Sequence, residues 1–367
     1  MTSNPPRFVM IGGFLGAGKT TTIAKLAKHY QSQGKKVGIV TNDQATDLVD
    51  TNLLRSQGFD VGEVAGSCFC CNFNALTDTV EQLGAGDRPD VIIAEPVGSC
   101  TDLVATVIRP LQQIYEQPFD IAPYGVIVKP SHGLKILKKI KRGGFSPQAE
   151  YIFRKQIEEA DFVLLNRIDE LSADQVSELI QLIEADFANM PSIRISAKTG
   201  EGFEGLTEYL ELRGEFGKRL MDVDYDVYAE GEAELGWLNA QLSVQSDQPF
   251  EIDRLLEDLV NRIQQSLNEE ESEVAHLKAI GMQDGQFAVV NLVSSDSRSV
   301  LSVPSRHSAK SAELVVNARV ATDPERLTRH VQDAIDSICH EKGIRSEMRA
   351  LQSFKPGRPV PTHRIQT

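Results

Sequence analysis

The feature that most constrains the fold is the segment Gly13-Phe14-Leu15-Gly16-Ala17-Gly18-Lys19-Thr20. Its spacing, G-x-x-x-x-G-K-[ST], is that of a loop whose backbone N–H groups close around phosphate groups. An apolar run at 7–11 precedes the loop, and residues 20–33 carry apolar side chains at helical spacing. Because a strand, a glycine loop and a helix N-terminus in this order gather amides and the helix dipole at one point, the segment predicts a phosphate-binding site.

Each residue of this loop has an expected role. The Lys19 ammonium reaches the outer phosphates of a nucleotide, and the Thr20 hydroxyl can ligate Mg²⁺. The candidate nucleotide-binding residues here are Gly13, Gly16, Ala17, Gly18, Lys19, Thr20 and Thr21.

The first part of the chain alternates short apolar runs with amphipathic helical patterns. This alternation predicts an α/β fold, a P-loop domain whose mostly parallel sheet is covered by helices on both faces. Ligands in such sheets bind at the carboxyl ends of the strands. The expected strands are 7–11, 36–41, 90–94, 124–128, 162–165 and 192–195.

The pattern changes after residue 212. Residues 1–212 are expected to form the P-loop domain, and the acidic stretch 213–234 reads as a linker. Residues 235–341 follow a β-α-β-β-β-α order, with Asp284-Gly285 as a hairpin turn, and predict a small α+β domain. Residues 342–367 are basic and contain prolines, and we expect a tail that is loosely ordered unless it docks.

Composition limits the classes of partner. The net charge of −14 argues against broad binding to nucleic acid or to an acidic membrane surface. We find neither a signal peptide nor an apolar run long enough to cross a membrane, so the expected location is the cytoplasm. In a reducing compartment five cysteines would not normally form disulfides. A homodimer remains possible.

Two further motifs follow expected strands. Glu95 and Gly98 lie where a carboxylate can hold Mg²⁺ and a glycine N–H can sense the γ-phosphate, so with Lys19 and Thr20 they are the candidate catalytic residues. Asn166 and Asp169 resemble the N-K-x-D motif with which GTPases read guanine, with Arg167 in the lysine position. The companion base-contact loop is expected at Ser196, Ala197 and Lys198.

Three of the five cysteines lie within four residues, at Cys68, Cys70 and Cys71. Thiolates this close can chelate Zn²⁺ or a similar cation. Because alternation along a strand would separate them, the segment has to curl. Cys100 is either a small core residue or a further sulfur ligand, and Cys339 is expected in a core.

The P-loop, the C-x-C-C segment and the E-x-x-G motif together resemble the CobW/HypB/UreG-type metal-handling GTPases, most closely the CobW-type branch, over about residues 7–212. The resemblance implies binding of GTP or GDP, Mg²⁺ and a transition metal (zinc, or cobalt or nickel). It also implies delivery of the metal, or of a cofactor, to a client metalloenzyme. Where that family commonly has two acids after the second strand, this chain has Thr41 and Asp43, so Asp43 is the candidate acid for Mg²⁺.

These residues lead to a hypothesis and two alternatives. GTP binding would order the segments around Asp43 and Glu95, which flank the cysteines, and hydrolysis, slow without a partner, would release the metal. In the first alternative the zinc is structural and the GTPase is a chaperone of a cobalamin-dependent or other metalloenzyme. In the second, the chain is a P-loop small-molecule kinase.

Overall fold

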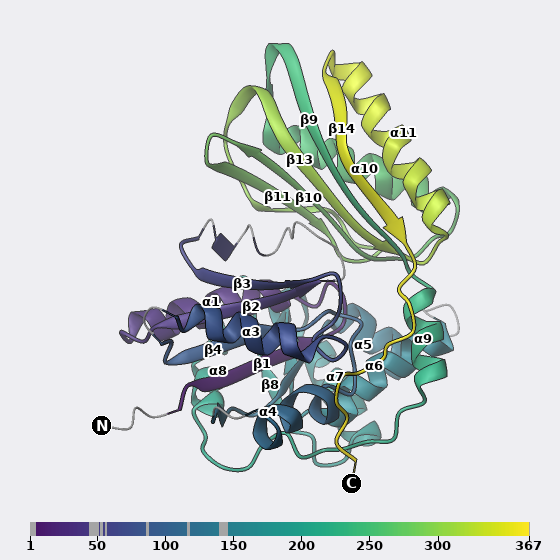
Figure 1. Ribbon diagram of the computed structural model, residues 1–367. Coiled ribbons are helices and arrows are strands. Elements are labelled where there is room, and N and C mark those ends of the chain that lie inside the picture. Colours follow the sequence, from purple (N-terminus) through teal and green to yellow (C-terminus); the bar gives the residue numbers. More distant parts are fainter. Residues whose placement is uncertain are drawn as a thin grey trace. The chain divides into compact units, whose positions relative to one another are not determined.

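The computed structural model describes residues 5–43, 51, 54–55, 57–85, 88–115, 118–138 and 146–366. The chain divides into two compact units (Figure 1). Unit 1 comprises Met1–Tyr228 together with Arg358–Thr367, and unit 2 comprises Ala229–Gly357. The last ten residues therefore belong to the same unit as the P-loop.

Unit 1 contains a parallel sheet in the order β3-β2-β4-β1-β6-β7-β8, with β5 paired to β1. The expected α/β fold class is confirmed. The strands are β1 (Arg7–Gly13), β2 (Val37–Asp43), β3 (Asp60–Ala65), β4 (Val91–Glu95), β5 (Asp120–Ile121), β6 (Gly125–Val128), β7 (Phe162–Leu165) and β8 (Ser192–Arg194).

Helices pack on both faces of this sheet because its central strands are apolar on both sides. Every residue of β1 is buried. Val9 and Ile11 pack in one core with Ile23 and Leu26 of α1. The helices of unit 1 are α1 (Lys19–Ser32), α3 (Phe73–Leu83), α4 (Arg109–Gln113), α5 (Pro130–Leu137), α6 (Pro147–Glu159), α7 (Ala173–Asp186) and α8 (Phe203–Leu210); α9 (Tyr225–Ala233) runs from unit 1 into unit 2.

Strand β3 was not among the expected strands. It lies at the edge of the sheet and pairs only with β2 in the described order, so Val61 and Val64 are buried and its other residues remain exposed or half-buried. The mixed sequence Asp60–Ala65 therefore lacks the continuous apolar run that marks a central parallel strand.

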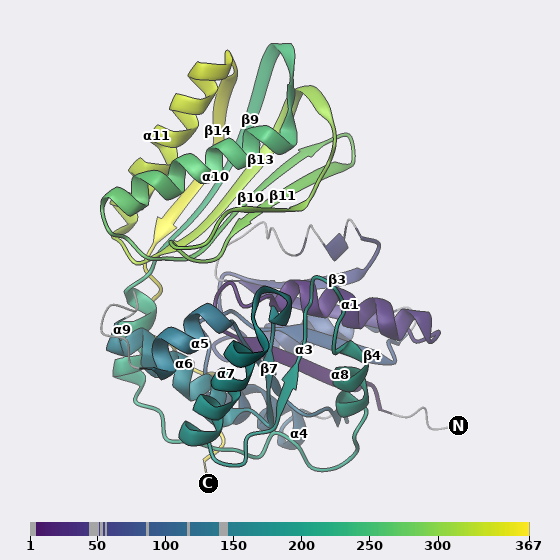
Figure 2. The ribbon, with the colours of Figure 1, turned by 180° about the vertical axis from the view of Figure 1, so that it is seen from behind.

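Unit 2 is an antiparallel sheet in the order β12-β11-β10-β13-β9-β14. Its two long helices lie on one face of the sheet (Figure 2) and share a core with it. This is the α+β arrangement expected for the region. The elements are β9 (Gly236–Glu251), α10 (Ile252–Glu269), β10 (Val274–Gln283), β11 (Gln286–Leu292), β12 (Val300–Val303), β13 (Ser308–Val320), α11 (Pro324–Lys342) and β14 (Arg345–Phe354).

Two segments differ from the linker and tail expected from the sequence. Within 213–234 the chain forms helix α9, and within 342–367 it forms β14, which pairs with β9 along its length. Most of β14 is exposed, so its polar sequence carries no apolar alternation that could have marked it as a strand.

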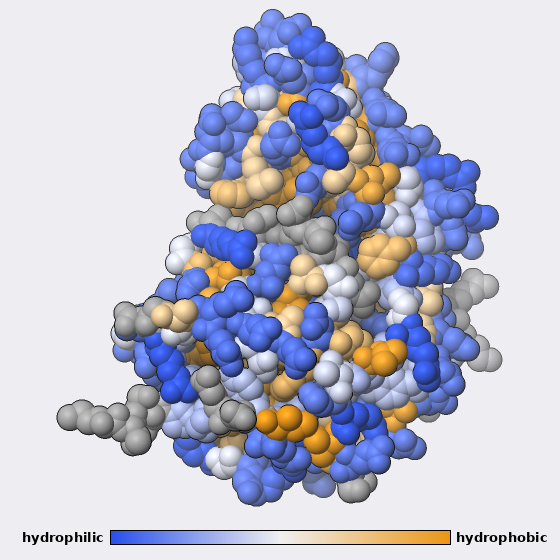
Figure 3. All heavy atoms as spheres, in the orientation of Figure 1, coloured by the Kyte–Doolittle hydropathy of each residue, from blue (hydrophilic) through white to orange (hydrophobic). Residues whose placement is uncertain are grey.

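The visible surface of unit 1 is largely hydrophilic with small separate apolar patches (Figure 3), as the net charge of −14 leads one to expect. Among the helices that the structure describes, none combines the length and the apolar character that a membrane crossing requires.

Candidate nucleotide and metal site

The P-loop connects β1 to α1, and its backbone requires glycine. Gly13 and Gly18 adopt φ angles of 134° and 98°. A Cβ at Gly13 would lie 2.6 Å from the Ile127 carbonyl oxygen, and one at Gly18 would lie 2.4 Å from Asn166 Nδ2. Gly16 also has a positive φ, 67°. Side chains at these positions would force the loop open, which explains the glycine spacing of the motif.

Three candidate catalytic side chains meet beside this loop. Lys19 is buried, and its Nζ donates a 3.0 Å hydrogen bond to the Gly13 carbonyl. The Thr20 hydroxyl donates a 2.8 Å bond to Glu95 Oε1. A hydroxyl oxygen and a carboxylate in contact are the hard oxygen ligands that Mg²⁺ takes. The residues present therefore fit that ion.

The Glu95 segment also touches the loop at Gly98. A Cβ added there would lie 2.9 Å from Lys19 Nζ and 2.8 Å from a methyl carbon of Leu15. Glycine allows this approach without displacing either side chain. Gly98 is thus placed against the lysine expected to hold the outer phosphates.

Asn166 holds the base-reading loops against the P-loop. Its Nδ2 donates a 2.8 Å bond to the Ala17 carbonyl. Its Oδ1 accepts bonds from the backbone N–H groups of Ala197, at 2.9 Å, and Arg167, at 2.8 Å. The amide therefore fixes three loops in one place, and a role in positioning follows directly from these contacts.

The remaining residues expected to contact the nucleotide have different environments. Asp169 and Lys198 are exposed, as is Thr21 in the first turn of α1. Ser196 is buried, and its hydroxyl accepts a 3.0 Å bond from the Thr199 N–H, closing the turn. The Arg167 guanidinium donates to Glu170 rather than into the P-loop.

The end of β2 reaches the cysteine loop through a residue that the sequence reasoning missed. Asn42 donates to the carbonyls of Val64, at 2.9 Å, and Ser67, at 2.7 Å, and accepts a 2.9 Å bond from the Phe69 N–H. A lone amide beside the acid at a strand end was the available signal. The side chain of Asp43, the expected acid, lies outside the described part of the structure.

The three clustered thiols do converge. The sulfur of Cys68 lies 3.0 Å from that of Cys70 and 3.1 Å from that of Cys71, and the last two sulfurs are 3.7 Å apart. The curl comes from a turn in which the N–H groups of Cys71 and Asn72 donate to the Cys68 carbonyl, preceded by Gly66 at φ 81°.

This donor set fits a borderline-soft cation. In a tetrahedral site with Zn–S distances of about 2.3 Å, sulfurs lie about 3.8 Å apart. The Cys70–Cys71 separation of 3.7 Å is close to this value, and the two separations from Cys68, 3.0 and 3.1 Å, are shorter. Among the described residues, these three cysteines form a group whose possible ligand atoms all lie within 4.8 Å of one another.

The thiols share their protons unequally. Hydrogen bonds from Cys100, Cys70 and Cys71 hold the pKa of Cys68 far below its usual value. The pKa of Cys70 is raised by the same network, first through Cys100 and then Cys68, and the bond to Cys68 raises that of Cys71 to about 11. The cluster therefore favours a thiolate that accepts hydrogen bonds from the neighbouring thiols.

Cys100 thus belongs to the sulfur network as well as to the core, and it is 1% exposed. Its carbonyl accepts a 2.8 Å bond from Gln156 Nε2, which also donates to the Gly98 carbonyl at 3.0 Å. One amide on α6 therefore holds the whole stretch between the P-loop lysine and the sulfurs.

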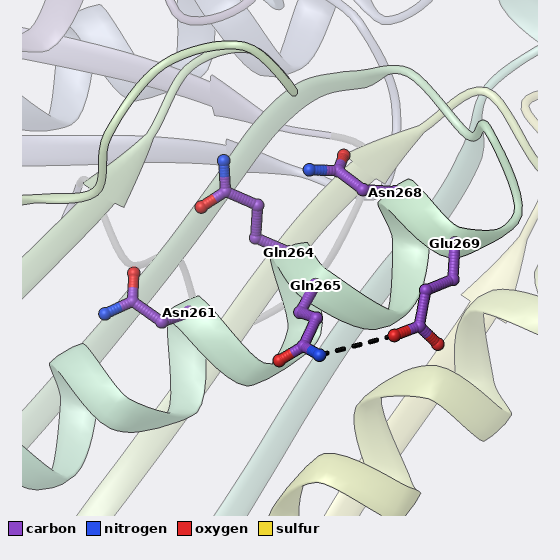
Figure 4. Close-up of a pocket in the computed structure, with 5 residues that line it drawn as sticks. All are labelled: Asn261, Gln264, Gln265, Asn268 and Glu269. Atoms are coloured by element: carbon purple, nitrogen blue, oxygen red, sulfur yellow. Dashed lines mark hydrogen bonds between the residues drawn. The ribbon is translucent and has the colours of Figure 1, made fainter.

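Unit 2 has a shallow hollow of about 500 Å³ on α10 (Figure 4). It offers four amide side chains and one carboxylate, and Gln265 Nε2 donates to Glu269 Oε1 at 3.3 Å. This chemistry differs from that of the P-loop and the sulfur cluster, both of which lie in unit 1. The lining residues are Asn261, Gln264, Gln265, Asn268 and Glu269.

Comparison with known proteins points to one family. The chain is 25% identical to the zinc chaperone CobW of Sinorhizobium sp. over 52% of its own length and 59% of the relative's. It is 27% identical to the zinc chaperone YeiR of Escherichia coli K12 over 46% of its length and 49% of the relative's. The chain thus matches about half the length of these curated relatives.

Among solved structures, the Zn(II)-bound YjiA GTPase of E. coli aligns over 91% of this chain and 99% of its own, with 15% identity and a TM-score of 0.39. The model of the CobW/HypB/UreG nucleotide-binding domain matches residues 7–192, half of the chain. The chain therefore belongs to the CobW/HypB/UreG family.

Proposed function

We propose that this protein is a GTP-hydrolysing metallochaperone that binds zinc at its cysteine cluster and couples the state of the nucleotide to release of the metal to a client protein. The observation that carries the proposal is the short segment Glu95–Cys100. It meets Thr20 and Lys19 of the P-loop at one end and the sulfur network at the other.

The nucleotide side of the proposal rests on the P-loop and on the loops that Asn166 holds beside it. Lys19 neutralises phosphate charge, and Asp169 accepts hydrogen bonds from guanine. Thr20 and Glu95, with Asp43, hold Mg²⁺, which supplies charge neutralisation at the β- and γ-phosphates. Since these residues offer no evident general base, we expect hydrolysis to be slow until a partner completes the site.

The metal side rests on the geometry of the sulfurs. Cys68, Cys70 and Cys71 supply three ligands on one curled loop. Cys100, which shares hydrogen bonds with Cys68 and Cys70, is our candidate for the fourth. Four thiolates would close a tetrahedral zinc site, whereas three leave one position open for exchange. We infer that movement of Glu95–Cys100 between nucleotide states switches the site between these two forms.

The coupling is tested by titrating metal-free protein with Zn²⁺ against a competing chelator under anaerobic conditions. The titration is done with Mg²⁺ and a non-hydrolysable GTP analogue, and again with GDP. We expect zinc affinities that differ at least about tenfold, or 1.4 kcal/mol. Equal affinities would mean that the zinc is structural. The first alternative would then hold, in which the GTP cycle acts on the client protein without moving the metal.

Two variants make the titration specific. Cys70→Ala removes a buried central sulfur and should abolish tight zinc binding in both states while nucleotide affinity is retained. Cys339→Ala is the matched control, because Cys339 is a buried thiol on α11 of unit 2. If Cys339→Ala weakens zinc binding as much as Cys70→Ala does, the metal is not held where we propose.

A further inference from the structure

The C-terminal segment of the chain lies directly on the cysteine loop. The Val360 N–H donates a 3.3 Å bond to the Cys71 sulfur. The Thr362 N–H donates to the Cys70 carbonyl at 2.8 Å, and the Thr362 hydroxyl donates to the Cys71 carbonyl at 3.0 Å. Nearly 300 residues separate the two segments in sequence, yet one donates a hydrogen bond to a candidate metal ligand of the other.

The same segment is anchored a few residues beyond Cys100. Arg364 Nε donates a 2.7 Å bond to Asp102 Oδ2, and its Nη2 donates a 3.0 Å bond to the Met221 carbonyl. The Ile365 N–H donates to the Ala105 carbonyl at 2.9 Å. Asp102 is 1% exposed, so loss of Arg364 would leave a buried carboxylate without its cationic partner.

We propose that residues 358–366, here called the clasp, form a removable cover over the cysteine loop and control how fast metal enters and leaves it. The inference rests on the proposed metal role of the cysteines and adds a regulatory element to that site. The yellow trace ending at C in Figure 1 is this segment.

The chemistry of the contacts suits a cover that opens and closes. Because a sulfur atom is a weak hydrogen-bond acceptor, the 3.3 Å bond from the Val360 N–H to Cys71 costs little to break. Two of the other bonds, from the N–H groups of Thr362 and Ile365, join main-chain groups and depend little on sequence. Pro359 and Pro361 flank Val360 and limit the conformations of the released segment, so closing costs less entropy.

The clasp also touches both elements of the proposed coupling. It binds the Cys70–Cys71 turn on one side and Asp102–Ala105, the continuation of the Glu95–Cys100 segment, on the other. A shift of Cys100 relative to Cys70 would therefore strain the clasp. Opening of the clasp and the change in nucleotide state are expected to favour each other.

Val360→Pro provides the sharpest test. The Val360 side chain is 69% exposed, so the substitution removes the N–H bond to Cys71 with little loss of packing. Val360→Ala keeps the N–H and is the matched control. Two rates are measured: transfer of zinc from loaded protein to excess chelator, and alkylation of Cys71 by iodoacetamide in metal-free protein, followed by peptide mass spectrometry.

We expect Val360→Pro to raise both rates about tenfold, and deletion of residues 358–367 to raise them further, with Val360→Ala unchanged. If the deletion variant unfolds, Arg364→Ala replaces it, since this substitution removes the anchors to Asp102 and to the Met221 carbonyl and leaves the bonds of Val360 and Thr362 in place. Rates equal to those of the unmodified chain in Val360→Pro and in the folded deletion or anchor variant would overturn the clasp. The alkylation rate needs no metal, so faster alkylation without zinc binding would refute the metal role but retain the cover.

Discussion

The hydroxyl of Thr20 and the carboxylate of Glu95 are in direct contact, 2.8 Å apart, although 75 residues separate them. The contact exists because β1 and β4 are adjacent parallel strands, with Met10 opposite Ala94, so their carboxyl ends open at the same edge of the sheet. The contact brings together a hydroxyl and a carboxylate, two groups that ligate hard cations such as Mg²⁺.

Glu95→Gln keeps the size and the hydrogen bond from Thr20 but removes the negative charge. We expect Mg²⁺-dependent GTP hydrolysis to fall about a hundredfold. The reason is that the Mg²⁺ ion, which neutralises phosphate charge in the transition state, loses its carboxylate ligand. Affinity for GDP without Mg²⁺ should be unchanged. Glu204→Gln, at the exposed start of α8, is the control, and hydrolysis followed by phosphate release is the measurement.

Asn42 makes two hydrogen bonds to the cysteine loop, at Ser67 and Phe69, and a third to Val64 of β3, so Asn42→Ala should weaken zinc binding without touching a sulfur. Loss of a buried donor and acceptor costs about 1–3 kcal/mol. If this cost falls on the zinc-bound form of the loop, zinc affinity decreases about five- to hundredfold. Chelator competition measures the effect. Unchanged zinc affinity in a correctly folded variant would mean that the three sulfurs reach their zinc-binding positions without the hydrogen bonds of Asn42.

Cys100→Ser tests whether the fourth sulfur responds to the nucleotide. The substitution keeps the size but removes a thiolate, so we expect the ratio of the zinc affinities in the GTP-analogue and GDP states to approach one. The three remaining cysteines should still bind zinc. X-ray absorption on the loaded protein counts sulfur ligands, and an unchanged count with an unchanged affinity difference would exclude Cys100 from the site.

His132 gives the folded protein a dependence on pH. Burial, followed by the neighbouring charges of Lys129, Lys135 and Arg167, lowers its pKa well below 6.5. The imidazole therefore stays neutral in the folded chain, whereas the unfolded chain binds a proton as the pH falls through 6.5. The contribution of His132 to the free energy of unfolding is complete above pH 6.5 and is lost below it.

The measurement compares the unmodified chain with His132→Gln in urea unfolding at pH 7.5 and 5.5. The stability advantage of the histidine should shrink by about 1.4 kcal/mol between the two pH values. Other buried acids, such as Glu159, whose pKa is raised well above its usual value, affect both proteins equally and cancel. A constant difference across this range would show that folded His132 also takes up the proton. The ring centroids of His132 and Phe14 of the P-loop lie 5.9 Å apart, so protonation of His132 would occur beside the nucleotide site.

Much of unit 1 could be predicted because its features are local in the sequence. The apolar run before Gly13 and the glycine spacing that follows are dictated by backbone sterics, which act over a few residues. The curl at Cys68–Cys71 is also a local feature, because three thiols within four residues can converge only if the backbone turns between them. The Asp284-Gly285 turn in unit 2 is another local signal, and the hairpin of β10 and β11 follows from it.

Other contacts depend on residues that are distant in the sequence, and their motifs carry no local signal. Asn42 looks like any amide at the end of a strand until β2 and β3 pair and bring the Ser67 carbonyl beside it. Strand β14 has almost no apolar pattern because it forms an exposed edge, and only its pairing with β9 defines it.

The sequence by itself determined the phosphate loop, the strand–helix alternation and the presence of a thiol cluster, because steric and periodic constraints within a short window specify them. The tertiary structure alone decided that Cys100 shares hydrogen bonds with those thiols, that Glu95 meets Thr20, and that the Val360 N–H reaches the Cys71 sulfur. These relationships arise from hydrogen bonds and packing between segments that come together only when the sheet assembles, and no local rule encodes them.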